Sequence, residues 1–343
     1  MNNLTSLPQI PQVFVIVLNW NNAPDSIECL ESIFKLNNDN FQVLVCDNDS
    51  TDNSVELILG WLAEHKLTVD EVSETDLTLV KSKLNTDVVL IKNKQNYGYA
   101  GGNNRGLSYT LSVGGKEDFV WIVNNDTTFH PEALNALIND AAQRSDVGLF
   151  GSTILDYHTR NTIQTQGGDR FYPWFGMSRH IGEGRLPKDG LSQETVESRM
   201  SYVVGASIFI RLATVRLLGL MAEEYFLYFE EVDWAIRARR LGINLGYAPK
   251  SLVYHKEGGT VGASVSNRRK SPLADFYGIR NRLLITRRLF PWALPTVYLA
   301  MFLVTFMKRL LTGQLDRAWM VLAIMLGVAK SPAQPNQATF SLE

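Results

Sequence analysis

The chain has 343 residues, of which 45% are hydrophobic and 20% are charged. This balance is typical of a globular protein and excludes a mainly disordered one. The formal net charge of −2 at pH 7 excludes a surface that attracts nucleic acid non-specifically, so no nucleic-acid partner is expected. The length predicts one large domain with an appendage.

The N-terminal stretch MNNLTSLPQIPQ has neither a basic segment nor an apolar run, so no secretory signal is predicted. The two cysteines of the chain are Cys29, in a helical pattern, and Cys46, at the end of an apolar run. We interpret both as reduced thiols in the core, which fits a cytosolic protein.

Short apolar runs alternate with helical patterns along the first half of the chain. Strands are predicted at 13–18, 41–46, 88–92, 119–123 and 147–151. The helices between them are predicted from about Pro24, after the polar turn 47–54, after the segment GYAGGNN, and from Pro131. Continuous apolar strands alternating with helices predict an α/β fold with a mostly parallel sheet covered by helices on both faces.

Two segments interrupt this alternation. Residues 67–86 are mixed and polar and are interpreted as an insertion. Residues 157–200 are rich in Gly, aromatic and charged residues, and irregular structure over one end of the sheet is expected there. Order returns over 202–255, with a strand, two helices and two short strands at 243–248 and 251–255.

The C-terminal tail is basic and apolar. No acidic residue occurs from Phe276 to Leu315, and six basic residues bracket the run PWALPTVYLAMFLVTFM. This run has about 17 residues, the lower limit for a membrane span, and Pro291 and Pro295 shorten its helical part. We expect shallow insertion into an anionic membrane surface. The alternative is a buried helical hairpin or a homodimer contact.

Three polar clusters directly follow predicted strands, at 19–22 (NWNN), 47–52 (DNDSTD) and 124–126 (NND). Ligands of parallel sheets bind outside the carboxyl ends of the strands, so the clusters are expected to meet at one edge.

The clusters, with further pieces in the same order, resemble the family 2 glycosyltransferases with the GT-A fold, especially the bacterial rhamnosyltransferase-like branch. The matching pieces are LNWNN, VCDNDSTDNS, NYGYAGGNNRG, WIVNNDT, VVGASIFIRL, YFLYFEEVDWAIRARRLG and YHKEGGTVG. The resemblance implies a catalytic domain over 1–275, with a nucleotide-sugar half at about 10–150 and an acceptor half at about 151–275. The remaining 276–343 would form a C-terminal helical region that associates with the membrane.

The resemblance also implies the residues that bind a nucleotide-sugar donor. Asp47, with Asn19 nearby, would recognise a uracil or thymine ring, because a loop carboxylate can accept a hydrogen bond from the imide N–H of the base. Asp49 would accept a hydrogen bond from a ribose hydroxyl. An Asx-turn with a helix cap is the alternative. The donor set is completed by Asn96, Gly98, Gly102, Asn103 and Asn125. For the glycines, the alternative is a flexible connection.

NND occupies the place of the family's metal-binding Asp-x-Asp. Asp126 is the first-choice ligand of a divalent cation, Mg²⁺ or Mn²⁺, and Asn124 departs from the family pattern. His255 would complete the site by resemblance. The alternatives are a turn that caps the following helix and a structural histidine.

YFEEVDW holds the expected catalytic base, which the resemblance places in a Glu–Asp pair at a helix start. Here the pair is Glu230–Glu231, and Glu231 is our choice, with Asp233 second. The alternative is helix electrostatics, including an Asp233–Arg237 pair. Tyr172 and Trp174 would stack on sugar rings or pack in the core.

The resemblance therefore implies an inverting, metal-dependent glycosyltransferase. By the same resemblance it would move a sugar such as rhamnose from a dTDP- or UDP-sugar to a glycan or lipid-linked acceptor. It would act in the cytoplasm at the inner face of the plasma membrane. One alternative is a sugar-phosphate nucleotidyltransferase, which needs a Gly-rich basic loop after the first strand; the chain has LNWNNAPDS there. The other is a catalytically silent membrane scaffold.

Overall fold

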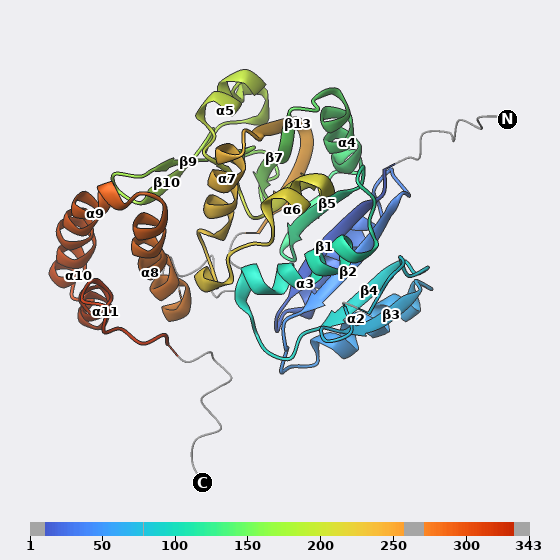
Figure 1. Cartoon of the computed structure of the whole chain (residues 1–343), viewed down its shortest axis with the longest axis horizontal. Coiled ribbons are helices and arrows are strands. Elements are labelled where there is room, and N and C mark those ends of the chain that lie inside the picture. The colour runs from blue at the N-terminus through green and yellow to red at the C-terminus, as the bar shows by residue number, and fades with distance from the viewer. Residues whose placement is uncertain (1–10, 78, 257–270, 333–343) are drawn as a thin grey trace, which may run out of the picture.

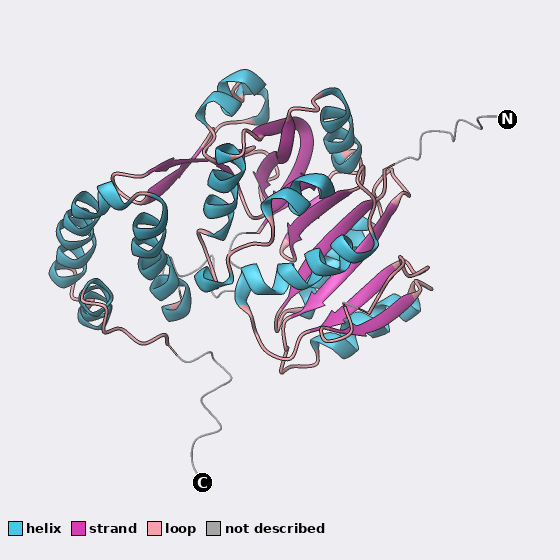
Figure 2. Cartoon of the chain, in the orientation of Figure 1, coloured by secondary structure: helices cyan, strands magenta, loops and turns pink. Residues whose placement is uncertain are grey.

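The computed structural model describes residues 11–77, 79–256 and 271–332. The main sheet is built from β1 (Val13–Asn19), β2 (Phe41–Asp47), β3 (Val69–Ser73), β4 (Val88–Lys92), β5 (Phe119–Asn124), β6 (Thr127–Phe129), β7 (Val147–Asp156), β8 (Ile163–Gln166), β12 (Ser207–Arg211) and β13 (Asn244–His255). Within the described residues these ten strands run in the order β3-β4-β2-β1-β5-β12-β7-β13-β6, and β8 pairs with β7 (Figures 1 and 2). The strands from β3 to β5 are parallel, as are β7 and β13, which confirms the predicted mostly parallel sheet.

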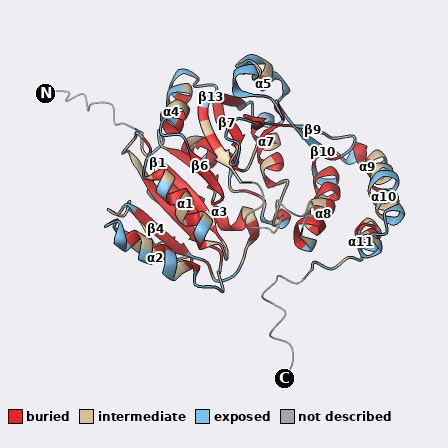
Figure 3. Cartoon of the chain, turned by 180° about the vertical axis from the view of Figure 1, so that it is seen from behind, coloured by how far each residue is buried: buried red, intermediate tan, exposed pale blue. Residues whose placement is uncertain are grey.

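Helices cover both faces of this sheet because successive side chains of each strand point to opposite sides. Val13, Val15 and Val17 of β1 pack into one buried cluster, and Phe14 and Ile16 pack into another. The first cluster is covered by α1 (Ala23–Ile33), α2 (Ser54–Glu64) and α4 (Ala133–Gln143), which Figure 3 shows from behind. The second is covered by α3 (Gly98–Val113), α6 (Leu212–Leu218) and α7 (Glu230–Arg240), in front in Figure 1. The free thiols of Cys29 and Cys46 are buried, one in each cluster, as predicted.

Two strand predictions need correction. Residues 69–73, inside the expected insertion, form β3, which pairs with β4. β3 lies at the edge of the sheet, where its polar Asp70 and Glu71 are tolerated, so its sequence lacks the apolar run of a central strand. The two short strands expected over 243–255 are one long strand, β13, with a register shift between Ala248 and Leu252. Pro249 lies at this shift, where a missing N–H is tolerated.

The segment 157–200 is more ordered than expected. It contributes β8, β9 (Gly168–Tyr172) and β10 (Met177–His180). In a small antiparallel sheet, β9 lies between β10 and β11 (Tyr202–Val203), which comes just after the segment. A short helical turn η1 (Pro187–Asp189) and α5 (Gln193–Arg199) follow the hairpin. The hairpin of β9 and β10 reaches from the main sheet towards the C-terminal helices (Figure 1).

The C-terminal helices form a layer of their own beside α7. They are α8 (Pro272–Leu289), η3 (Pro291–Ala293), α9 (Leu294–Ala300), the π-helical η4 (Met301–Phe306), α10 (Met307–Leu311) and α11 (Leu315–Met325). A small apolar core joins α8 to the helices after it. The expected domain boundary between residues 275 and 276 falls within α8.

The segment Pro291–Leu311 is a continuous helical stretch of 21 residues with a mean hydropathy of 1.4, and only 11% of its most apolar window is buried. In the described part of the chain it is the one helix long and apolar enough to cross a membrane. This low burial does not fit the alternative of a buried hairpin.

Candidate active site

The three polar clusters meet at one edge of the sheet, as predicted. In the parallel pairings Asn19 of β1 lies beside Asp47 of β2, and Leu18 lies beside Asn124 of β5. The ends of these three strands therefore carry their polar side chains to a common edge.

A chain of buried hydrogen bonds joins these clusters. Asn125 Nδ2 donates to Ser26 Oγ at 3.0 Å, Ser26 Oγ donates to Asn19 Oδ1 at 2.7 Å, and Asn19 Nδ2 donates to Asp47 Oδ1 at 2.8 Å. All four side chains are buried, so each bond fixes its neighbour's orientation. Ser26 of α1 was not predicted, because a single serine in a helix carries no pattern of its own.

Asp47 and Asp49 differ in their surroundings. Asp47 also accepts from the backbone N–H and hydroxyl of Ser50, at 3.0 and 2.6 Å, so the Asx-turn alternative is present in the structure. Asp49 is exposed in the same loop with a φ of 62°. Partial burial, and then the charge of Asp47, raise the pKa of Asp49.

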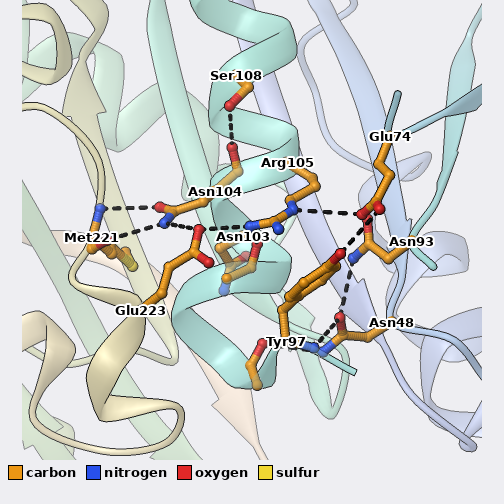
Figure 4. A network of polar contacts seen from close by, with 12 residues as sticks. Asn48, Glu74, Asn93, Tyr97, Asn103, Asn104, Arg105, Ser108, Met221 and Glu223 are labelled. Atoms are coloured by element: carbon orange, nitrogen blue, oxygen red, sulfur yellow. Dashed lines mark hydrogen bonds and ion pairs between the residues drawn. The ribbon is translucent and has the colours of Figure 1, made fainter. Parts of the chain in front are cut away.

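Asn48, which was not predicted, organises the loop before α3 (Figure 4). Its Nδ2 donates to Asn96 Oδ1 at 2.8 Å and to the carbonyl of Gly98 at 3.0 Å. Its Oδ1 accepts from Asn93 Nδ2 at 3.0 Å and from the N–H of Tyr97 at 3.1 Å. One buried amide thus holds the predicted Asn96 and Gly98 in place.

The glycines of GYAGGNN lie in the first turns of α3, where a loop was expected. Gly98 has a φ of 70°, and a Cβ there would collide with the carbonyl of Phe226. A Cβ on Gly102 would collide with Leu18 of β1. Close packing against protein therefore explains both glycines without a ligand. Asn103 is buried, its Nδ2 donates to the carbonyl of Tyr99, and its Oδ1 has no hydrogen-bond partner.

The NNRG part of the same motif fastens α3 to the segment before α7 (Figure 4). Asn104 Nδ2 donates to the carbonyl of Met221 at 3.0 Å and to Glu223 Oε1 at 2.9 Å. Arg105 pairs with Glu223 at 2.6 Å and lies over the Tyr97 ring, 3.7 Å from its centre. This network ties the donor side to η2 (Glu223–Tyr225), which precedes the predicted base.

Asp126 and His255 face each other across β6 and β13. Asp126 Oδ1 lies 3.3 Å from His255 Nε2, and both side chains are largely buried. Gln164 Oε1 lies 3.0 Å from His255 Nδ1, so Gln164 orients the ring. Asn124 lies half-buried at the end of β5. The described residues contain no group of three or more His, Cys, Asp or Glu that could hold a metal, so this edge offers two such donors. Residues 257–262 of the YHKEGGTVG piece lie outside the described residues.

The glutamate pair lies at the start of α7, after a strained loop. Phe226, Tyr228 and Phe229 have φ values of 65°, 69° and 75°, in the left-handed region that non-glycine residues rarely adopt. Oε2 of Glu230 and Oε2 of Glu231 are both shielded from solvent and have no hydrogen-bond partner. Unpaired buried carboxylate oxygens are costly, so their presence here points to function.

Burial perturbs both glutamates. It raises the pKa of Glu231 to about 7, and the negative charge of Asp169 on β9 adds to the effect. It raises the pKa of Glu230 well above the ordinary value, with the charge of Glu231 as the second cause. Two adjacent carboxylates shielded from solvent cannot both ionise easily, so Glu230 stays neutral where Glu231 ionises.

Asp233, the second choice for the base, is fully buried and engaged. Its Oδ1 accepts from Arg237 Nε at 2.7 Å, the predicted i,i+4 pair. Its Oδ2 lies 3.1 Å from the Tyr225 hydroxyl and 3.1 Å from Arg288 Nε. Both oxygens are thus occupied, so Asp233 holds α7 in place and does not face a substrate.

Helix α8 clamps the strained loop from the other side. The Nδ2 of the buried Asn281 lies 2.7, 2.7 and 3.0 Å from the carbonyl oxygens of Tyr225, Leu227 and Tyr228. Sequence reasoning missed Asn281 because it lies some fifty residues from its partners, in a basic tail.

The loop 204–206, between β11 and β12, contacts both the end of β5 and the first turn of α3. The N–H of Asn124 donates to the carbonyl of Ala206, and the hydroxyl of Tyr99 donates to the carbonyl of Gly205 at 2.7 Å. Burial, and then the charges of Glu231 and Glu230, raise the pKa of Tyr99, so the glutamate pair lies close to this tyrosine. A cavity of about 400 Å³ runs along the loop and reaches His255. Tyr172 and Trp174 are exposed on the hairpin, away from the core.

Comparisons with known proteins agree with this architecture. Residues 14–189 match the sequence profile of Glycosyl transferase family 2, and residues 119–330 match that of Glycosyl transferase family group 2. The chain is 26% identical, over 60% of its length and 62% of the relative, to the low-salt glycan biosynthesis hexosyltransferase Agl10 of Haloferax volcanii. It is 24% identical, over 51% of its length and 61% of the relative, to the N-acetylglucosaminyl-diphospho-decaprenol L-rhamnosyltransferase of Mycobacterium tuberculosis. The chain thus spans about three fifths of the length of these two relatives.

A third relative, the dTDP-rhamnosyl transferase RfbF of Shigella flexneri, is 20% identical over 74% of this chain and 81% of its own. Among solved structures, the mannosyltransferase PcManGT of Pyrobaculum calidifontis, in complex with GDP-Man and Mn²⁺, superposes with a TM-score of 0.53 at 16% identity, covering 93% of this chain and 86% of its own. S. aureus TarS 1–349 superposes with a TM-score of 0.52 at 14% identity, and the match covers 92% of this chain and 80% of the TarS chain. At these identities the structures support the fold alone. The chain belongs to glycosyltransferase family 2 and has the GT-A fold, with rhamnosyltransferases among its relatives.

Proposed function

We propose that the protein is an inverting glycosyltransferase that moves a sugar from a nucleoside diphosphate donor to a hydroxyl of a glycan or lipid-linked acceptor. One observation carries the proposal: Glu231 holds a shielded carboxylate oxygen with no protein partner, at the start of a helix whose preceding loop is held by Asn281. Such an oxygen is suited to accept the proton of an acceptor hydroxyl.

The roles proposed for the residues of this chain are donor binding and proton transfer. Asn19 and Asp47, locked by the buried chain to Ser26, hold the pyrimidine end of the donor, and Asp49 accepts from the ribose. Glu231 takes the acceptor proton, and neutral Glu230 keeps negative charge from accumulating beside it. Attack opposite the departing diphosphate inverts the anomeric centre. Two relatives are named as rhamnosyltransferases, so a dTDP-linked deoxyhexose is the proposed donor.

A divalent cation fits the Asp126–His255 pair. The two donors face each other, and Gln164 fixes the imidazole, which is the support a ligating histidine needs. Asp126 and His255 would hold Mn²⁺ or Mg²⁺, with Asn124 beside them, and the cation would neutralise charge on the leaving diphosphate. The solved neighbour PcManGT was determined with Mn²⁺ bound.

The direct test is a screen of nucleotide-sugars for thermal stabilisation and for turnover, each with and without Mn²⁺. The proposal expects one pyrimidine nucleotide-sugar to raise Tm and to be hydrolysed slowly without acceptor. A catalytically silent scaffold would bind a donor without turnover. A nucleotidyltransferase would instead require a sugar phosphate and a nucleoside triphosphate.

The pH dependence of kcat/KM follows from the raised pKa of Glu231. A general base must be ionised, so we expect kcat/KM to rise about tenfold per pH unit below about 7 and to level off above it. Because the charge of Asp169 helps to raise this pKa, Asp169→Asn should move the rising limb to lower pH. Initial rates from pH 5 to 9 measure both. A flat profile for the wild type would remove Glu231 from the role.

The tail is proposed to bind the inner membrane surface peripherally. Leu303 and Val304 are 55% and 61% exposed in the apolar helix, and basic residues flank it. We expect Leu303→Glu/Val304→Glu to abolish co-sedimentation with phosphatidylglycerol vesicles. Leu57→Glu/Leu79→Glu, at exposed leucines outside the tail, should bind normally. Carbonate should strip the wild type from membranes, and resistance to carbonate would indicate a crossing helix instead.

A further inference from the structure

A cavity of about 500 Å³ beside the β9–β10 hairpin contains none of the residues assigned above to donor, cation or base. Its lining includes four arginines, Arg170, Arg179, Arg185 and Arg199. Glu183 is the one carboxylate in this lining. We call the four arginines the arginine cluster.

Within the described residues the four arginines of the cluster have no acidic side chain paired with them. In the described residues none of its four guanidinium groups forms an ion pair, whereas Arg105, Arg144, Arg237 and Arg309 each pair with a carboxylate. Four like charges around one cavity repel each other, and in a chain of net charge −2 this concentration is not a general surface property. An anionic ligand removes the repulsion.

The register of the hairpin explains how the cluster is presented. Arg170 lies opposite Arg179, so both point to the same, exposed face. The other face carries Asp169 and Phe171, which are buried, and Asp169 is the group whose charge acts on Glu231. One hairpin therefore supports the glutamate site on one face and the arginine cluster on the other.

The cavity continues towards the proposed active site. His180 and Glu183 line both this cavity and the one that reaches His255. A ligand with an anionic group in the arginine cluster can therefore extend past His180 to the Asp126–His255 edge.

The tip of the same hairpin contacts the apolar tail. The centres of the Trp174 and Trp292 rings lie 4.5 Å apart in an edge-to-face arrangement. Thr296 Oγ1 donates a hydrogen bond to the carbonyl of Trp174, and Arg282 Nε donates one to the carbonyl of Phe175. Trp174, Phe175 and Trp292 are each more than half exposed. Arg170 lies four residues before Trp174, so at 3.3 Å per strand residue the two are at most about 13 Å apart along the hairpin.

We infer that the arginine cluster binds the phosphate or diphosphate that links an acceptor sugar to its lipid. This inference rests on the proposed function, since it names the acceptor of the same site. Guanidinium groups recognise phosphate oxygens in bidentate fashion, and a diphosphate offers enough oxygens for several of them. The lipid leaves towards Trp174 and the tail, and the sugar extends past His180 towards the Asp126–His255 edge. Phospholipid head groups carry the same chemistry, so the experiment must separate the two sources.

The first arm measures binding on the full chain and needs no donor. The probe is a short-chain prenyl diphosphate, compared with inorganic pyrophosphate and with the prenyl alcohol. We expect Arg170→Gln/Arg179→Gln to weaken prenyl diphosphate binding by at least about tenfold. The matched control Lys35→Gln/Lys116→Gln removes two exposed charges elsewhere and should bind as the wild type does. Equal binding by both double variants overturns the inference.

The second arm measures transfer with the donor found in the screen. For a prenyl-diphosphate-linked acceptor sugar we expect KM to rise at least about tenfold in Arg170→Gln/Arg179→Gln. KM for the same sugar on a neutral octyl aglycone, and donor hydrolysis, should stay within about twofold. Unchanged KM for the diphosphate acceptor, with loss of phosphatidylglycerol vesicle binding, assigns the cluster to head groups and overturns the inference. Absence of turnover in the wild type refutes the proposed function but leaves the binding result standing.

Discussion

Glu231→Gln is expected to lower transfer turnover by at least about 100-fold, because glutamine cannot accept the proton of the acceptor hydroxyl. The substitution keeps the size of the side chain and its place at the start of α7. Single-turnover measurements with saturating donor and acceptor separate the chemical step from binding. KM for the donor should change little, since Glu231 is not assigned to donor binding. Unchanged turnover would exclude Glu231 as the base.

The same variant carries an internal check on folding. Burial raises the pKa of the Glu231 carboxyl group in the folded state, so this group binds more protons in the folded than in the unfolded chain. It therefore destabilises the folded protein as the pH rises above the pKa that the group has in the unfolded chain. Glu231→Gln removes this effect, and Tm at pH 8 should be equal to or higher than that of the wild type. Lost activity with a preserved or raised Tm cannot come from unfolding. The exposed Glu194→Gln on α5 is the control for a neutralised acid elsewhere.

Asp126→Ala is expected to abolish the Mn²⁺-dependent part of donor stabilisation and to lower turnover by about 100-fold or more. Asp126 is the carboxylate of the NND cluster, and its Oδ1 lies 3.3 Å from His255 Nε2. Thermal shift with donor, titrated with Mn²⁺ and with EDTA, measures the effect.

Asn124→Asp is the complementary variant. It adds a second carboxylate at the strand end and should lower the Mn²⁺ concentration needed for half-maximal stabilisation, because a divalent cation prefers charged oxygen ligands. If Asp126→Ala retains full Mn²⁺ dependence and Asn124→Asp changes nothing, the cation site lies elsewhere.

Much of the fold followed from the sequence because its signals were local. Buried parallel strands such as 13–18 and 119–123 are continuous apolar runs, and their polar ends had to meet at one edge. β3 was missed because an edge strand tolerates Asp70 and Glu71. The β9–β10 hairpin was missed because Arg170 and Tyr172 on its outer face alternate with Asp169, a buried acid that no strand pattern predicts.

The candidate site was predictable where a motif signals chemistry and unpredictable where one residue supports another. Ser26, Asn48 and Gln164 each position a predicted residue, but each is a single small polar side chain with no periodic pattern. Gly98 and Gly102 were singled out for ligand approach, yet packing against Phe226 and Leu18 accounts for them. Such contacts join residues far apart in sequence, which spacing alone cannot reveal.

The clamp of Asn281 on the loop before α7 has a practical consequence for anyone who trims the protein to make it easier to handle. Cutting at the sequence-suggested boundary near residue 275 would remove Asn281 and Arg288 in one step, along with most of α8. The three left-handed residues before Glu230 would then relax, and a soluble fragment could fold well yet be inactive. A shortened version that keeps this clamp must therefore retain α8 through Leu289, and the apolar side chains that α8 packs against later in the chain argue for keeping those helices as well.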